Sequence, residues 1–317
     1  MQSPFSKDPF VLSIPSEREP TFDLSPGEGD ALSSSVTQFK KQGDGPESVR
    51  WIGNATCIVE IGGVRIMTDP NFLHQGDHVH LAPGVVAQRL KDPAFNYEEC
   101  PPVDFIILSH LHADHFDDLV AAHLRRNIPI ISNPHAVAGL AEQGFTSLAA
   151  LNTWDAVLVR NEVGAVCRIT SMPGKHTLGE HPHGSVLETI PPVMGSLIEI
   201  LGDGEDVKYT LYISGDTLYY DELKEIRVKY PTINLALLHL GGTTIPVINV
   251  MVTMDAEQGM QLLCALNPER AIPIHMDDYD AFLSGLDDFK KVVEREGWGD
   301  RVTFLDRGEA YYFSRTK

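Results

Sequence analysis

The sequence has few cysteines and no paired arrangement of them. Cys57, Cys100, Cys167 and Cys264 are widely separated, and no C-x-x-C motif is present. Isolated cysteines of this kind are typical of free thiols in a reducing compartment. We therefore expect four buried free thiols and a cytoplasmic protein.

Long apolar runs are also missing. No stretch of about 18 consecutive apolar residues occurs, so no membrane-spanning helix is predicted. The first twenty residues, MQSPFSKDPFVLSIPSEREP, lack the basic start and the apolar core of a secretory signal peptide. We therefore expect no stable membrane insertion.

Positive charge is scarce. The chain has 25 Lys and Arg against 44 Asp and Glu, a formal net charge of −19. Because binding to nucleic acid needs clustered Lys and Arg that neutralise phosphates, nucleic acid is not an expected partner. A negative surface attracts cations, including metal ions, and part of the negative charge fits a metal site counted without its metal.

The composition is that of a globular protein, with 317 residues of which 43% are hydrophobic. Residues 1–46 are rich in Pro, Ser, Gly and charge, and we interpret them as an N-terminal extension that is partly disordered or draped over the surface. The folded domain is expected over residues 47–317. An extension of this length can exchange onto a neighbouring copy, so a homo-oligomer stays open.

Strand patterns come first in the domain, and strands then alternate with helices. Two β-rich runs at 57–61 and 64–68 flank Gly62 and Gly63, which predicts a hairpin. Residues 71–101 are expected to form a loop. Further strands are predicted at 105–108, 129–132, 156–160, 165–170, 195–201, 208–214, 235–240, 271–274, 302–305 and 310–313, and helices at 117–127, 137–143, 255–266 and 286–296. This order favours α/β sheets covered by helices.

The segment LSHLHADHFDD, residues 108–118, directly follows the strand predicted at 105–108. Its spacing lets His110 and His112 converge on one point as the chain leaves the strand, while Asp114 and His115 aim at a second point nearby. Imidazole and carboxylate together suit zinc, and also manganese or iron, in a site with an open position. The segment therefore predicts half of a metal site.

Three further candidate ligands each follow a strand-like run. They are His176 in MPGKHT, Asp216 in YISGDT and His275 in AIPIHM. Active-site ligands in sheet enzymes are commonly delivered by the loops that follow strands. Four such deliveries in one chain reinforce one another.

These motifs, together with WIGNAT at 51–56, TDP at 68–70 and HMDDYDAF at 275–282, resemble the metallo-β-lactamase fold hydrolases. The resemblance is to the branch that contains ascorbate phosphate lactonase and N-acylphosphatidylethanolamine phospholipase D, and it covers roughly residues 48–313. It implies an αββα sandwich of two mixed β-sheets flanked by helices, with metals at one edge between the sheets.

The resemblance also implies a role for each motif residue. One metal would be held by His110, His112 and His176, and a second by Asp114, His115 and His275, with Asp216 bridging both. A hydroxide shared by the two ions would be the nucleophile. Asp114 would also take or return a proton, Asp69 would hold a ligand histidine through its ring N–H, and Tyr279 and Asp280 would orient His275.

Other polar residues are candidates for contact with the substrate. His239 either donates to a developing oxyanion or is a structural histidine with satisfied hydrogen bonds. His181 and His183 either line the mouth of the pocket or lie on the surface. Thr243 and Lys175 are candidate substrate-binding residues, and Lys175 and Arg89 are the only candidates for binding a phosphate near these motifs.

We first expect a dinuclear metal-dependent hydrolase, most simply a zinc enzyme, that opens a small lactone or lactam or cleaves an acyclic amide. The alternative within the same chemistry is a phosphodiesterase or a phospholipase D. A phosphate substrate requires Lys or Arg in the pocket, whereas a neutral lactone or lactam requires apolar walls. From a different class, a non-catalytic metal-binding protein stays open, although the complete ligand set argues against it.

Overall fold

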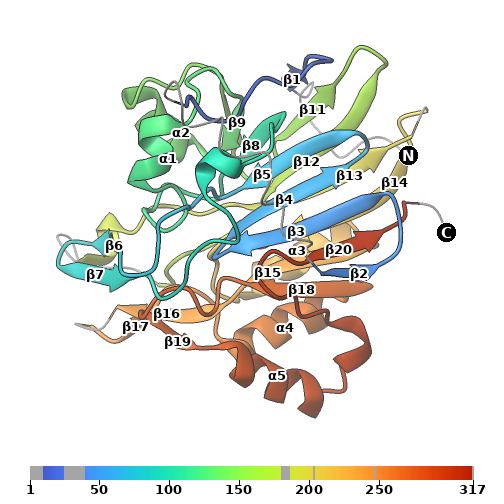
Figure 1. Cartoon of the computed structure of the whole chain (residues 1–317). Coiled ribbons are helices and arrows are strands. Elements are labelled where there is room, and N and C mark those ends of the chain that lie inside the picture. The colour runs from blue at the N-terminus through green and yellow to red at the C-terminus, as the bar shows by residue number, and fades with distance from the viewer. Residues whose placement is uncertain (1–9, 25–39, 180–185, 203, 246–247, 316–317) are drawn as a thin grey trace.

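Two mixed β-sheets lie face to face in the computed structural model, which describes residues 10–24, 40–179, 186–202, 204–245 and 248–315 (Figure 1). The first sheet has the order β1-β11-β12-β13-β14-β15-β18. Its strands are Phe10–Ser13 (β1), Ala156–Arg160 (β11), Ala165–Met172 (β12), Gly195–Leu201 (β13), Val207–Ile213 (β14), Leu235–His239 (β15) and Arg270–Ile274 (β18).

The second sheet has the order β10-β9-β8-β5-β4-β3-β20-β2. Its strands are Leu148–Ala150 (β10), Ile130–Ser132 (β9), Phe105–Ile107 (β8), Val64–Thr68 (β5), Thr56–Ile61 (β4), Glu47–Gly53 (β3), Ala310–Phe313 (β20) and Lys41–Gly43 (β2). The predicted hairpin is β4–β5, where Ile61 pairs with Val64 across Gly62 and Gly63. Both glycines have positive φ, 62° and 79°, which a tight two-residue hairpin turn requires.

Helices cover the outer face of each sheet, and Figure 1 shows α1 and α2 apart from α4 and α5 with the strands between them. The helices are Asp118–His123 (α1), Pro134–Glu142 (α2), Lys224–Lys229 (α3), Ala256–Leu266 (α4) and Leu286–Arg295 (α5). Short 3-10 turns lie at Tyr97–Glu99 (η1), Val186–Thr189 (η2), Asp221–Leu223 (η3) and Gly299–Arg301 (η4). Asp255 caps α4, because its side chain accepts a hydrogen bond from the backbone N–H of Gln258.

The main core lies between the sheets and combines inward-facing residues of both, such as Val59 and Phe105 from one and Ile169 and Leu237 from the other. A second core joins the first sheet to α3, α4 and α5, and a third joins the second sheet to α1 and α2. Because strand residues point alternately to opposite faces, each sheet has two apolar faces to bury. The expected αββα sandwich is confirmed.

Two small sheets stand at one end of the sandwich and are visible at the left of Figure 1. One is the hairpin His78–Ala82 (β6) and Val85–Gln88 (β7). The other is Val250–Met251 (β17), Gly241–Ile245 (β16) and Phe282–Ser284 (β19). Their buried residues, among them Val79, Leu81, Val85, Ile245 and Val252, form a fourth apolar cluster.

Four expectations need correction. Residues 71–101 are not all loop, because they contain β6 and β7. Residues 302–305 form no strand and keep only an isolated bridge from Val302 to Ala271. Helix α1 ends at His123, since Leu124 turns extended and bridges to Phe22. Of the four free thiols, Cys57 and Cys167 are buried, Cys100 is half-buried and Cys264 is exposed.

Residues 10–24 lie on the domain. Strand β1 pairs in parallel with β11 at the edge of the first sheet. Ile14 and Phe22 are buried, and the ring of Phe22 packs edge-on against Phe72 with centroids 5.6 Å apart. This part of the N-terminal segment therefore contributes to the cores that support both sheets. No helix among the described residues has the length and apolar character needed to cross a membrane.

Candidate metal centre

Four loops that follow strands bring the candidate ligands together. His110, His112, Asp114 and His115 follow β8, His176 follows β12, Asp216 follows β14, and His275 directly follows β18. Their side-chain atoms form two groups, within each of which the ligand atoms lie within 4.8 Å of one another: His110, His112 and His176 in the first, and Asp114, His115, Asp216 and His275 in the second.

In the first group, three ring nitrogens converge. His112 Nδ1 lies 3.0 Å from His110 Nε2 and 3.2 Å from His176 Nε2. His110 and His176 are buried, and His112 is half-buried. Three ring nitrogens this close to one another could bind a single cation together.

In the second group, two carboxylates face two imidazoles. His275 Nε2 lies 3.3 Å from Asp114 Oδ2 and 3.4 Å from Asp216 Oδ2. His115 Nε2 lies 3.5 Å and 3.3 Å from the same two oxygens. All four side chains are buried. The second oxygens of both aspartates have no hydrogen-bond partner among the described residues, so each carboxylate keeps an open position.

The opposite nitrogen of three of the buried rings has a hydrogen-bond partner. His110 Nδ1 lies 2.9 Å from Ser109 Oγ, His176 Nδ1 lies 2.5 Å from the carbonyl of Val252, and His275 Nδ1 lies 2.9 Å from the carbonyl of Leu240. A ring that donates through Nδ1 presents a bare Nε2, which is the form that binds a metal. The backbone therefore selects the metal-binding tautomer of His176 and His275.

The carboxylate of Asp69 contacts the ring of His115, whose Nδ1 makes no hydrogen bond among the described residues. Its Oδ2 lies 3.2 Å from His115 Nδ1. The same carboxylate accepts from the backbone N–H and the hydroxyl of Ser109, at 2.6 and 2.9 Å. Asp69 has a positive φ of 35°, a conformation that costs energy outside glycine and is concentrated at functional sites. Asp69 thus joins the start of the metal-binding loop to one of its rings.

The pKa shifts divide the residues in the same two groups. Burial, followed by the neighbouring His176, lowers the pKa of His112 to about 3, and burial also lowers the pKa of His110 and His176. In the second group, burial alone would lower the pKa of His115, but the charges of Asp216 and Asp114 outweigh burial and raise this pKa. Burial likewise opposes ionisation of Asp114, yet His115 and His275 lower its pKa to about 2.

This donor chemistry fits two divalent cations. Three neutral imidazoles suit one ion, and two carboxylates with two imidazoles suit a second, because zinc, manganese and iron accept mixed nitrogen and oxygen ligands. Each group also has the three to four donors that a catalytic site uses while leaving a position open. Asp216 is the carboxylate that could serve both ions, because its negative charge acts on all three histidines of the first group and on both histidines of the second.

Sequence reasoning missed a residue that connects the two halves of the second group. The backbone N–H of Asn54 donates to Asp278 Oδ2 at 2.8 Å, and its carbonyl accepts from the backbone N–H of His275 at 3.1 Å. Its side-chain amide donates to the carbonyl of Asp114 at 2.7 Å. Asn54 is fully buried with φ of 46°, a conformation in which asparagine is enriched. The WIGNAT motif contained this signal.

Several candidates have contacts other than those expected. Asp280 is exposed and accepts a hydrogen bond from the backbone N–H of Gln88, so it anchors β7. The hydroxyl of Tyr279 donates to Asn71 at 3.1 Å. His275 is instead oriented by Leu240 and by the ring of Phe282, whose centroid lies 4.4 Å away.

His239 is fully buried behind the second group and does not line the pocket. Its Nε2 lies 3.7 Å from Asp69 Oδ2, and its ring packs 5.7–5.9 Å from those of His275 and His115. Burial lowers its pKa to about 4, so the ring is neutral. Because the ring does not line the cavity, its position argues against an oxyanion donor, but its Nε2 has no hydrogen-bond partner among the described residues, so its hydrogen bonds are not all satisfied. His181 and His183 lie outside the described residues.

A small cavity of about 20 Å³ opens onto the two groups. Its floor includes His112, Asp114, His176 and Asp216. Its walls are apolar or hydroxyl-bearing and come from β6–β7, β16–β17 and the loop after η2: Leu81, Ala82, Val85, Ile190, Thr243, Thr244, Ile245 and Val252. No Lys or Arg lines it among the described residues.

An αββα sandwich with two His/Asp groups at the strand ends defines a class, the metallo-β-lactamase-fold hydrolases. A family model described as the beta-lactamase superfamily domain matches residues 46–276, and the chain belongs to this superfamily. The expectation of a metal-dependent hydrolase of this fold is therefore confirmed.

Individual relatives and structures support the same class. The chain is 26% identical to a UPF0173 metal-dependent hydrolase of Methanopyrus kandleri over 263 residues, 83% of this chain and 98% of that protein. It is 24% identical to N-acyl-phosphatidylethanolamine-hydrolyzing phospholipase D 1 of Caenorhabditis elegans over 282 residues, 82% of this chain and 74% of that one. The crystal structure of an isothiocyanate hydrolase from Delia radicum gut bacteria is similar in fold, with a TM-score of 0.72 and 18% identity over 84% of this chain and 99% of that one.

Proposed function

We propose that this chain uses two divalent metal ions to hydrolyse a small uncharged carbon electrophile, in the first instance a lactone or a lactam. The observation that carries the proposal is the combination of two convergent ligand groups with a cavity whose described walls contain no Lys or Arg. A phosphate substrate needs a cationic partner, whereas a neutral ring needs apolar walls.

We assign the ligands as the family resemblance implies, with His110, His112 and His176 to one ion, and Asp114, His115 and His275 to the other, bridged by Asp216. Zinc is our first choice, and Mn²⁺ or Fe²⁺ would accept the same donors. When bound, such ions polarise a substrate oxygen and make a nucleophile from water at neutral pH.

The protein's own groups have separate tasks in this proposal. Asp114 lines the cavity, and its Oδ1 has no hydrogen-bond partner among the described residues, so it is the acceptor that we assign to take and return a proton. Leu81, Val85 and Ile245 restrict water access and bury the apolar part of the substrate.

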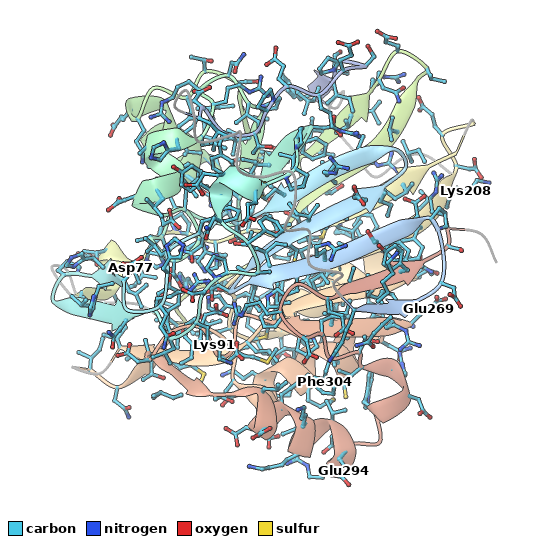
Figure 2. All side chains as sticks on the ribbon, viewed as in Figure 1. Asp77, Lys91, Lys208, Glu269, Glu294 and Phe304 are labelled. Carbon is cyan, nitrogen blue, oxygen red and sulfur yellow. The ribbon has the colours of Figure 1, made fainter. Side chains whose placement is uncertain are left out.

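The phospholipase D alternative would need a cation for the phosphate, and each nearby candidate has another partner. Arg89 is fully buried, with its guanidinium 3.0 Å from Asp278 and bonded to the carbonyl of Lys91. Lys175 Nζ lies 3.3 Å from Glu222 and 4.2 Å from the ring centre of Tyr220. Lys91 pairs with Asp277. Lys208 is remote from the cavity, because it lies at the opposite side of the molecule from Asp77, which directly precedes the cavity-lining strand β6 (Figure 2).

The fold neighbour named an isothiocyanate hydrolase suggests a second uncharged electrophile. An isothiocyanate carries an electrophilic carbon and an apolar substituent, and the same walls would accept it. It therefore belongs beside lactones and lactams in the test. A small-molecule substrate and a cytoplasmic location stay predictions, as does the oligomeric state.

The test combines metal content with a substrate panel. Protein purified without chelator is analysed for metal per chain and assayed with δ-valerolactone, δ-valerolactam, an alkyl isothiocyanate and bis(p-nitrophenyl) phosphate. We expect two metals and turnover of an uncharged substrate that chelator removes and metal restores. Preferred turnover of the phosphodiester would select the alternative reaction. Two bound metals with no turnover of any probe would favour a non-catalytic metal-binding protein.

A further inference from the structure

The Thr243 hydroxyl is a buried polar group that lines the cavity and belongs to neither ligand group. Thr243 lies on β16, is 6% exposed and lines the cavity together with His112, Asp114, His176 and Asp216. Its Oγ1 has no hydrogen-bond partner among the described residues. A buried hydroxyl without a partner costs free energy, so such a group in a ligand cavity points to a ligand that completes it.

The neighbouring threonines differ in this respect. The Thr244 hydroxyl donates to the carbonyl of Gly242 at 2.9 Å, and the Thr253 hydroxyl donates to Asp216 Oδ2 at 2.9 Å. A hydroxyl has a single proton to donate, so neither of these can also donate to a substrate. The Thr243 proton is uncommitted.

The backbone fixes Thr243 relative to the metal ligands. Its carbonyl accepts from the backbone N–H of Val252 at 2.8 Å, while the carbonyl of Val252 holds His176 Nδ1 at 2.5 Å. On its other edge, β16 pairs with β19, with Thr243 opposite Phe282, and the ring of Phe282 packs on His275. Thr243 is therefore tied to one residue of each ligand group, which is the rigidity that a substrate-orienting residue needs.

We infer that the Thr243 hydroxyl binds and orients the carbonyl oxygen of the substrate over the metal centre. This inference rests on the proposed function and specifies its substrate as a molecule with one hydrogen-bond acceptor on an apolar body. The acceptor meets Thr243, and the body meets Leu81, Val85 and Ile245. Because the surrounding walls are apolar, this one hydrogen bond decides orientation more strongly than it would in water.

The experiment separates binding from hydrolysis. Cyclohexanone has the ring size and the carbonyl of a six-membered lactone but no bond to hydrolyse, so its dissociation constant from the metal-loaded full-length protein is measured by ligand-observed NMR. The variants are Thr243→Val, which removes the hydroxyl and keeps the shape, and Thr243→Ser, which keeps the hydroxyl. Thr303→Val is the matched control, since Thr303 is 7% exposed and its hydroxyl already accepts from Arg270.

We expect Thr243→Val to weaken cyclohexanone binding by about tenfold, the size of one lost hydrogen bond. We expect Thr243→Ser to stay within about threefold of the natural protein, Thr303→Val to be unchanged, and all to keep the same metal content. Equal affinity of Thr243→Val and the natural protein, absence of cyclohexanone binding, or loss of metal in Thr243→Val would each overturn the inference. If Thr243 controls cyclohexanone binding while no lactone, lactam or isothiocyanate is hydrolysed, the inference stands and the proposed reaction is wrong.

Discussion

The side-chain amide of Asn54 donates a hydrogen bond to the backbone carbonyl of Asp114 across 2.7 Å, although 60 residues separate them in the chain. The carbonyl of the same Asn54 accepts from the backbone N–H of His275. One buried residue thereby sets the distance between two loops that supply the second ligand group. The metal geometry depends on this contact as well as on the ligands themselves.

Replacing Asn54 should loosen the second metal selectively. Asn54→Gly keeps the positive φ accessible and removes the amide, so we expect metal affinity of the second site to fall about tenfold or more, while the first site stays filled. Metal titration followed by elemental analysis would reveal this as one metal per chain at limiting supply. Equal loss from both sites would mean that Asn54 supports the whole fold and not one half of the centre.

Removing a ligand from either group should abolish activity. In His112→Ala the first group loses one of its three nitrogens, and in Asp216→Ala the second group loses one of its two carboxylates. We expect metal content to fall and kcat to drop by at least about 10³-fold, because the metals supply the nucleophile. Full turnover in either variant would refute the assignment of the centre.

His239→Ala should affect stability more than chemistry. The ring is fully buried beside Asp69, His115 and His275 but does not line the cavity. We expect the free energy of unfolding to fall by roughly 1–3 kcal/mol, with metal content retained and kcat changed less than about tenfold. Denaturant unfolding and steady-state kinetics on the same preparation measure both. A loss of kcat far beyond tenfold in fully metallated protein would restore the oxyanion role.

Acid should weaken the support beneath the metal centre through Asp278. Burial opposes ionisation of this carboxyl, but Arg89 at 3.0 Å and Arg307 at 2.7 Å outweigh it and hold its pKa below the ordinary value. A depressed pKa in the folded state stabilises the protein above the unfolded-state pKa, about 3.9, and this stabilisation is lost as the pH falls through the folded pKa.

Asp278→Asn should therefore be clearly less stable than the natural protein at pH 6, and the difference should shrink as the pH drops below about 4. Thermal unfolding of metal-free protein across pH 3–7 measures it, with Asp300→Asn on η4 as a control outside the Arg89–Asp278–Arg307 network. A stability difference that is constant with pH would show that the carboxylate charge does not matter.

The N-terminal segment should prove part of the folded unit. Phe22 is 4% exposed and packs on Phe72 and Tyr97, with ring centroids 5.6 and 5.4 Å away. Phe22→Ala should lower the free energy of unfolding by about 3–5 kcal/mol, the usual cost of such a cavity. Phe10→Ala is the matched control, because Phe10 is 56% exposed. Equal stability of both variants would mean that residues 10–24 only rest on the surface.

The sequence predicted the strand-to-loop positions of the candidate ligands and sheets covered by helices, and its resemblance to the metallo-β-lactamase fold hydrolases implied the αββα class. Ligand spacing after a strand and the alternation of strands with helices are local patterns, and local patterns can be read without coordinates. The sequence did not predict strands β6 and β7, because His, Gly and Asp interrupt the apolar pattern of that stretch. The hairpin depends on packing in the tertiary structure, where its apolar residues meet those of β16 and the segment after β17: Val79, Leu81, Val85, Ile245 and Val252.

The tertiary structure decided what the individual polar residues do. Lys175 and Arg89 were the candidates for binding phosphate, and their partners Glu222 and Asp278 lie 47 and 189 residues away in the chain. Thr243 and Thr244 are adjacent and chemically identical, yet the Thr244 hydroxyl is satisfied by Gly242 while that of Thr243 has no partner among the described residues. Residue type and spacing determine which metal chemistry is available, but the partners of each buried polar group depend on contacts between distant segments, and these contacts define the cavity beside the two ligand groups.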